Sequence, residues 1–139
     1  MDHAATMREC YDLINAHDVE GFSKFLAEDF VEHEVLEGLP PTKEGVKQFF
    51  AMNFAAFSDL RFEIEDIVAS GDKVVGRFRM VGTNDGEFMG MPATGKSVDA
   101  QGIDIIRFNE EGLGVEHWGV FDAMTMMQQL GVVPEGAPA

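Results

Sequence analysis

The spacing of apolar residues predicts helices in the first part of the chain and strands after residue 60. Between Asp2 and Ala16, apolar residues recur at positions i, i+3, i+4 and i+7, which together form one stripe of a helix. They are Met7, Cys10, Tyr11 and Ile14. A first helix is therefore expected over this segment.

Two more helices are predicted from residues whose side chains can accept hydrogen bonds from the free N–H groups of a first helical turn. Asp18 predicts a short second helix, and Thr42 predicts a third that ends near Ser58. The inner face of the second helix carries Val19, Phe22 and Leu26. The inner face of the third carries Val46, Phe49, Phe50, Phe54 and Phe57.

The second half of the chain alternates apolar and polar residues with a period of two, which is typical of strands. Two strands are expected on either side of a turn at Ser70–Asp72. Two longer strands follow, Val98–Phe108 and Leu113–Phe121, joined by a loop at Asn109–Gly112. A last helix is expected over Ala123–Leu130, with Asp122 as its N-cap.

This order of elements predicts an α+β fold, in which a cone-shaped, curved antiparallel sheet wraps around the N-terminal helices. A single domain is expected over residues 1–132. Residues 133–139, which contain the string PEGAP, are expected to form a flexible tail.

The charge of the chain excludes some classes of partner. It has 25 acidic and 10 basic residues, which gives a formal net charge of −15. Such a surface repels nucleic acid and anionic membranes, whereas a small apolar molecule is compatible with it. No apolar run reaches the roughly 18 residues of a membrane span, and no secretory signal is evident. With a single cysteine, Cys10, the expected location is the cytoplasm.

The last two strands bring candidate catalytic residues together. If Asn109–Gly112 is a four-residue hairpin loop, Asp104 lies directly opposite His117 on one face, and Gly102 lies opposite Gly119. An Asp–His pair in an apolar pocket suits proton transfer, because the carboxylate orients the imidazole. The alternative is a buried ion pair that only fixes the register of the strands.

Three further expectations concern His33, metal binding and the outer face of the sheet. His33 follows a segment that leads to the pocket rim, where it is either a third catalytic residue or only a polar rim residue. The candidate ligands are scattered, without the spacing of a metal motif, so no metal is expected. The outer face predicts a homodimer, because it would expose an apolar patch. The patch consists of Ile103, Ile105, Trp118 and Val120.

Several strings, in this order and spacing, resemble the SnoaL-like polyketide cyclases and their bacterial ester cyclase relatives. They are Gly82-Thr83, Gly90-Met91-Pro92, Asp104 to Phe108, Glu116-His117-Trp118, and Asp122 followed by Gln129-Leu130-Gly131. The resemblance covers nearly the whole chain. It implies the cone fold, a homodimer and no cofactor, while the same fold also hosts isomerases, epoxide hydrolases and binding modules.

The resemblance also assigns residues. Cyclases of this family close a ring by intramolecular aldol condensation, and their catalytic aspartate falls on Gly119 here. Their Gln falls on Gly102, their His on Asp104 and their Asn on Glu32. The candidate ligand contacts are Tyr11, Glu32, Gly102, Gly119, Phe121 and Met91.

A more distant resemblance links the string from Ile103 to Asn109 to bacterial ketosteroid isomerase. It places the oxyanion-stabilising Asp of that enzyme on Asp104 and its general base near His33-Glu34. Its Tyr falls beside Tyr11.

The expected function is therefore cofactor-free acid/base chemistry, such as cyclisation, isomerisation or hydration, on an apolar carbonyl compound. The alternative is a non-catalytic ligand-binding or dimerisation module. An epoxide hydrolase is less favoured, since Gly119 leaves one inward acid on the last two strands.

Overall fold

The computed structural model describes residues 2–133 and contains four α-helices in that range. The helices are α1 (His3–Asn15), α2 (Val19–Ser23), α3 (Lys43–Ala56) and α4 (Ala123–Leu130). The predicted caps are confirmed: the side chains of Asp18, Thr42 and Asp122 each accept a hydrogen bond from a backbone N–H of the first turn. Helix α4 ends at Leu130 and is capped by Gly131, whose φ of 78° is accessible to glycine at low cost. All but the first residue of the predicted tail lie outside the described residues.

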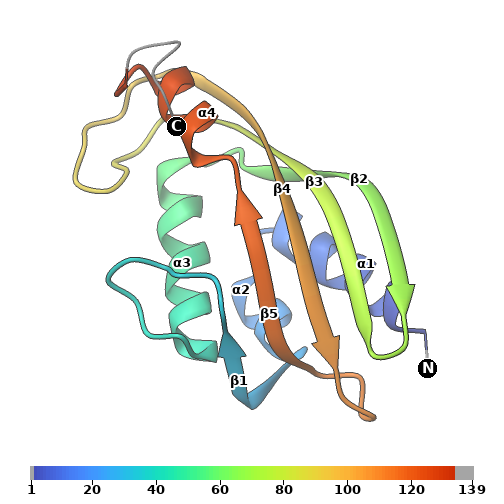
Figure 1. Ribbon diagram of the computed structural model, residues 1–139. Helices are drawn as coiled ribbons and strands as arrows, with labels where there is room; N and C mark the ends of the chain where they lie inside the picture. Colours follow the sequence, from blue (N-terminus) through green and yellow to red (C-terminus); the bar gives the residue numbers. More distant parts are fainter. Residues whose placement is uncertain (1, 134–139) are drawn as a thin grey trace.

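Five strands form one sheet in the order β1-β5-β4-β3-β2. Their bounds are β1 Leu26–Glu32, β2 Arg61–Ser70, β3 Lys73–Thr83, β4 Ser97–Phe108 and β5 Gly114–Phe121. The pairings from β2 to β5 are antiparallel. The α+β class with a curved sheet is confirmed, and Figure 1 shows the helices α1, α2 and α3 on one face of that sheet.

Strand β1 was not expected from the sequence, and it pairs with β5 in parallel, so the sheet is not purely antiparallel. Leu26 begins this strand and does not belong to helix α2. The alternation that marks a strand is broken here, because Ala27 and Leu26 are both buried and two exposed acids follow them. A shift in register between Leu26 and Val31 accounts for this irregularity.

The predicted register of the β4–β5 hairpin was wrong by two residues. Asp104 lies opposite Gly119, and Ile106 lies opposite His117. Phe108 pairs with Gly114, which lengthens the loop by one residue, and an irregularity beside Arg107 adds another. Side chains alternate between faces along a strand, so a shift of two residues leaves each one on its predicted face.

The buried side chains form two apolar clusters between the helices and the sheet. One joins α1 and α2 to the strands and includes Met7, Phe22 and Phe108. The other joins the end of α3 to α4 and the sheet, and includes Phe57 and Met126. No helix within residues 2–133 combines the length and apolar character needed to cross a membrane.

Candidate functional site

A cavity of about 600 Å³ lies between the helices and the inner face of the sheet. Its lining is mostly apolar and comes from all four helices, the sheet, the loop after β1 and the long loop between β3 and β4. The volume is that of a typical small-molecule site. No lysine or arginine is among the lining residues in the described part of the chain.

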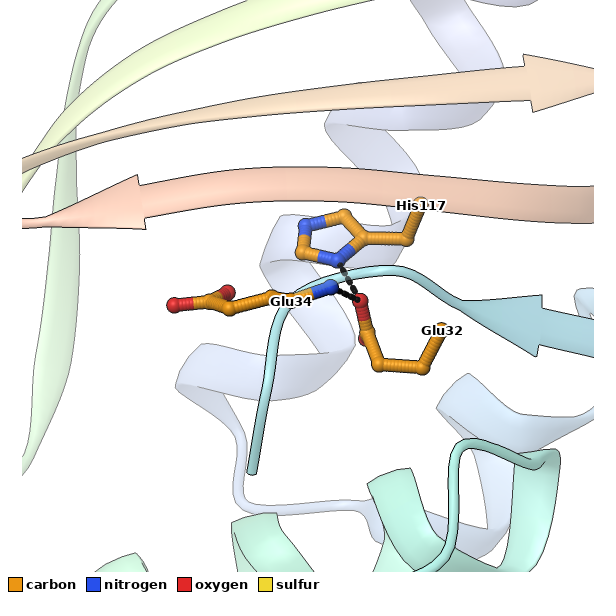
Figure 2. Close-up of side chains that lie close together, drawn as sticks. All are labelled: Glu32, Glu34 and His117. Atoms are coloured by element: carbon orange, nitrogen blue, oxygen red, sulfur yellow. Dashed lines mark hydrogen bonds and ion pairs between the residues drawn. The ribbon is translucent and has the colours of Figure 1, made fainter. Parts of the chain in front are cut away.

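Four polar side chains form a continuous hydrogen-bonded chain on the cavity wall. The hydroxyl of Tyr11 donates to Oδ2 of Asp104 over 3.0 Å. Nε2 of His117 lies 2.8 Å from the other oxygen, Oδ1, of Asp104. On the far side of the ring, Nδ1 of His117 lies 2.5 Å from Oε2 of Glu32. Figure 2 shows the contact between His117 and Glu32.

The four side chains of this hydrogen-bonded chain come from three strands and one helix. Tyr11 is on α1, Asp104 on β4, His117 on β5, and Glu32 at the end of β1 beside His117. Asp104 and His117 are diagonal neighbours, not direct partners, yet the imidazole reaches the carboxylate. Their predicted contact is therefore present, although the register that predicted it was wrong.

Burial and pairing fix the charge of His117. Its side chain is 13% exposed, and those of Glu32 and Asp104 are 5% and 16% exposed. Burial alone would lower the pKa of His117, but the hydrogen bonds to Asp104 and Glu32 outweigh it and raise the pKa to about 10. At neutral pH the ring is an imidazolium that donates from both nitrogens.

Tyr11, at the other end of the hydrogen-bonded chain, stays neutral. Burial, with the nearby charge of Asp104 and the hydrogen bond to it, raises the pKa of Tyr11 far above its usual range. The Tyr11 hydroxyl therefore stays protonated at neutral pH and donates to Asp104. Cys10 also borders the cavity, and burial raises the pKa of its thiol to about 12, so it is not a nucleophile.

Glu34, which the ketosteroid isomerase resemblance placed near a general base but which was not among the predicted site residues, is a further functional candidate. Its backbone N–H donates to Oε2 of Glu32 over 3.1 Å, while its carboxylate lines the cavity. Figure 2 shows its side chain extended away from Glu32. Within residues 2–133 this carboxylate has no hydrogen bond or ion pair. Burial is the main cause that raises its pKa above the ordinary value.

One group among the described residues has the make-up of a cation site. Glu32, Glu34 and His117 each offer one oxygen or nitrogen atom, and these atoms lie within 4.8 Å of one another. Nδ1 of His117 already shares a proton with Glu32 in this arrangement, so a cation would have to displace that proton.

His33 is not part of this group. Its ring stacks on Trp118, with centroids 4.9 Å apart, and its Nε2 lies 2.8 Å from Glu116. Trp118 and Glu116 point to the opposite face of β5 from His117. The structure thus places His33 on the outer side of the sheet, since β1 presents successive residues to alternate faces.

The two glycines do not open the space that was expected. They are not opposite each other, because Gly102 pairs with Phe121. A Cβ atom on Gly102 would lie 2.9 Å from Cε1 of Phe78, so the Phe78 ring already covers this position. A Cβ atom on Gly119 would meet the side chains of Glu34 and His117.

Of the remaining candidate contacts, Phe121 lines the cavity and Met91 does not. Met91 pairs with Phe88 in a short bridge, and the residues just before it, Phe88 to Gly90, border the cavity instead.

Comparison with known proteins assigns the chain to a family. The family model described as SnoaL-like polyketide cyclase matches residues 4–130. This chain belongs to the SnoaL-like polyketide cyclase family. No curated protein matches the chain.

Several solved structures share the SnoaL-like fold of this chain. AclR, a candidate hydroxylase from Streptomyces galilaeus, is 29% identical with a TM-score of 0.86, over 99% of this chain and 85% of AclR. IdmH, a candidate polyketide cyclase from Streptomyces antibioticus, is 32% identical with a TM-score of 0.81, over 94% of this chain and 99% of IdmH. A candidate polyketide cyclase from Bacillus cereus is 27% identical with a TM-score of 0.79, over 92% and 79% of the two chains. The family and these relatives indicate an enzyme of the cyclase or isomerase type.

Proposed function

We propose that this SnoaL-like protein catalyses cofactor-free proton transfer on a neutral, largely apolar carbonyl compound bound in the cavity. Cyclisation by aldol condensation and isomerisation of a ketone share a first step, the removal of a proton from the carbon next to a carbonyl. The observation that carries the proposal is the hydrogen-bonded chain from Tyr11 to Glu32 on one wall of an otherwise apolar cavity.

The hydrogen-bonded chain supplies electrostatic stabilisation for such a reaction. Tyr11 and His117 both border the cavity, and their hydrogen bonds within the chain hold the positively charged imidazolium beside it. A carbonyl oxygen beside them would be stabilised as it gains negative charge, and the stabilisation is strong because little water is present. Asp104 accepts a hydrogen bond from each of these side chains through its two carboxylate oxygens, so we assign it the role of orienting them and keeping the imidazole charged.

The charges around the cavity favour a neutral substrate. Its polar wall carries the acids Glu32, Glu34 and Asp104, and two more acids, Glu37 and Glu87, line it elsewhere. With no basic lining residue other than His117 in the described range, a carboxylate or phosphate ligand would meet net repulsion. An ester or ketone would not.

Deuterium exchange tests the proposal without knowledge of the natural substrate. The probe is 2-tetralone, a neutral bicyclic ketone whose acidic carbon–hydrogen bonds exchange slowly in heavy water. Catalysed exchange, followed by proton NMR at neutral pD, is the expected result. Binding of 2-tetralone with no exchange above that in buffer would instead favour a non-catalytic ligand-binding module.

A homodimer through the outer face of the sheet is a further part of the proposal. The face away from the cavity carries Val120 and Ile103, 70% and 40% exposed, beside Trp118 and Ile105. These four side chains come from directly paired positions on β4 and β5, so they form one apolar patch in the single chain. Packing against a second copy would remove this patch from water.

We also propose that the protein acts in the cytoplasm. Its one cysteine, Cys10, is buried and free, so the fold needs no oxidising compartment to form.

A further inference from the structure

The side chains of the hydrogen-bonded chain are already bonded to one another, so few of their atoms are free to accept a proton from a substrate. His117 uses both ring nitrogens and Asp104 uses both carboxylate oxygens. Glu32 holds the Nδ1 proton of His117 and is 6% exposed. A base must accept a proton from the substrate, which calls for a carboxylate that faces the cavity and is free of such partners.

Glu34 meets this requirement because of its position. It follows β1, and its carboxylate lies over Gly119 on the neighbouring strand β5. A Cβ atom on Gly119 would lie 2.6 Å from Oε1 of Glu34 and 2.7 Å from Cε1 of His117. Any larger residue at position 119 would therefore occupy the space that this carboxylate and the imidazole share.

The carboxylate and the imidazolium lie close to each other without a direct hydrogen bond. One oxygen of Glu34 lies within 4.8 Å of a ring nitrogen of His117. That separation leaves the oxygen free to contact a ligand, while the positive charge of the imidazolium lies close to the same ligand. Figure 2 shows the Glu34 carboxylate pointing away from the contact between Glu32 and His117, and Glu34 is among the residues that line the cavity.

We infer that Glu34 is the general base of this site and that it acts in the space above Gly119. The inference rests on the proposed function. Glu34 removes the proton from the carbon next to the carbonyl, and the electron pair of that bond moves onto the carbonyl oxygen to give an enolate. The positive charge of the His117 imidazolium, which borders the cavity, stabilises the enolate oxygen electrostatically.

The proton then remains on Glu34 until it is returned. In an isomerisation it goes to another carbon of the same enolate. In a ring closure the enolate carbon attacks a second carbonyl of the substrate, and Glu34 protonates the new alkoxide, so atoms and charge balance without a co-reactant. Burial of Glu34 among Asp104 and Glu32 makes its carboxylate more basic than that of an exposed glutamate, which suits this exchange at neutral pH.

Substitution of Glu34 by the isosteric amide tests the assignment with the 2-tetralone exchange assay. Glu34→Gln should lower the catalysed exchange rate by about 10²-fold or more, while the affinity for 2-tetralone and the circular dichroism spectrum stay near wild type. Glu110→Gln is the matched control. It makes the same chemical change at an exposed residue of the β4–β5 turn, outside the cavity lining, and should leave the rate unchanged.

A second variant tests the place at which the base acts. In Glu34→Asp the carboxylate is kept but is withdrawn by one methylene group from the space above Gly119, so the exchange rate should fall at least about tenfold. A Glu34→Asp rate equal to that of wild type would overturn the assignment of this space.

The outcomes separate the inference from the proposed function. If wild type shows no exchange above buffer, the proposed function fails. If wild type catalyses exchange and Glu34→Gln stays within threefold of it, the function stands and the role of Glu34 is overturned. Wild-type exchange that is lost on chelation with EDTA and restored by Zn²⁺ would also overturn it, because Glu34 would then act as a metal ligand.

Discussion

The imidazolium of His117 between two buried carboxylates should make the stability of this protein fall as the pH rises from 7 to 9. The pKa of His117 is raised from an ordinary value of 6.5 to about 10 in the folded state. A group with a raised pKa contributes its full stabilisation below the unfolded-state value, and the contribution is lost as the pH rises through the folded-state value. The test therefore compares how the free energy of unfolding changes with pH in wild type and in His117→Gln.

The size of the effect follows from the difference in bound protons. Between the two pKa values the folded state holds about one proton more than the unfolded state, which costs about 1.4 kcal/mol of stability per pH unit. The side chain of His117 is 13% exposed, so solvent screens this interaction little. From pH 7 to pH 9 the loss should be about 2–3 kcal/mol, a substantial part of the stability of a domain of this size.

Urea unfolding at pH 7, 8 and 9, followed by far-ultraviolet circular dichroism, measures the effect. Other groups titrate in this range in both proteins, so the difference between wild type and His117→Gln isolates the contribution of the histidine. If His117→Gln is too unstable to measure, Glu32→Gln keeps a hydrogen-bond acceptor beside Nδ1, removes one charge, and should shift the decline to lower pH. If the free energy of unfolding falls with pH at the same rate in wild type and in the variant, the proposal that His117 is a buried imidazolium is refuted.

Two further predictions concern the Asp104 carboxylate and the outer face. Asp104→Asn should lower 2-tetralone exchange by about 10²-fold while costing about 1–3 kcal/mol of stability, and near-normal exchange with the same loss of stability would show that the Asp104–His117 pair is only structural. Val120→Asp should convert a dimer to a folded monomer in analytical ultracentrifugation, because it places like charges across a two-fold interface. A wild-type protein that sediments as a monomer at micromolar concentration would contradict the proposed dimer.

The helices were predictable from sequence because their signals are local. Asp18, Thr42 and Asp122 cap helices as expected, and each needs only a backbone N–H three residues away. Strand β1 was not predictable in this way. Its pairing with β5 joins segments about 85 residues apart, and its two exposed acids and register shift hide the alternation of a strand.

The candidate site was predictable only in part. The contact of Asp104 with His117 was anticipated because the face of a side chain depends on whether its position is odd or even, which a two-residue shift preserves. The placement of His33 depended on the unseen β1–β5 pairing, which sends it outward and Glu32 inward. Glu34 had two signals in the sequence. The resemblance to ketosteroid isomerase places a general base near His33-Glu34, and Gly119 stands where the resembled cyclases have an aspartate, which leaves space for a carboxylate from another element.

The pH dependence of wild-type deuterium exchange into 2-tetralone tests the central claim most directly. The base must be ionised, and the pKa of Glu34 is raised above 4.5, mainly by burial. The imidazolium must be protonated, and the pKa of His117 is about 10. The account predicts catalysed exchange that rises with pH from a value above 4.5, reaches a plateau, and falls again as the pH approaches 10. A rate that equals the buffer rate at every pH, on protein shown by circular dichroism to be folded, would contradict it.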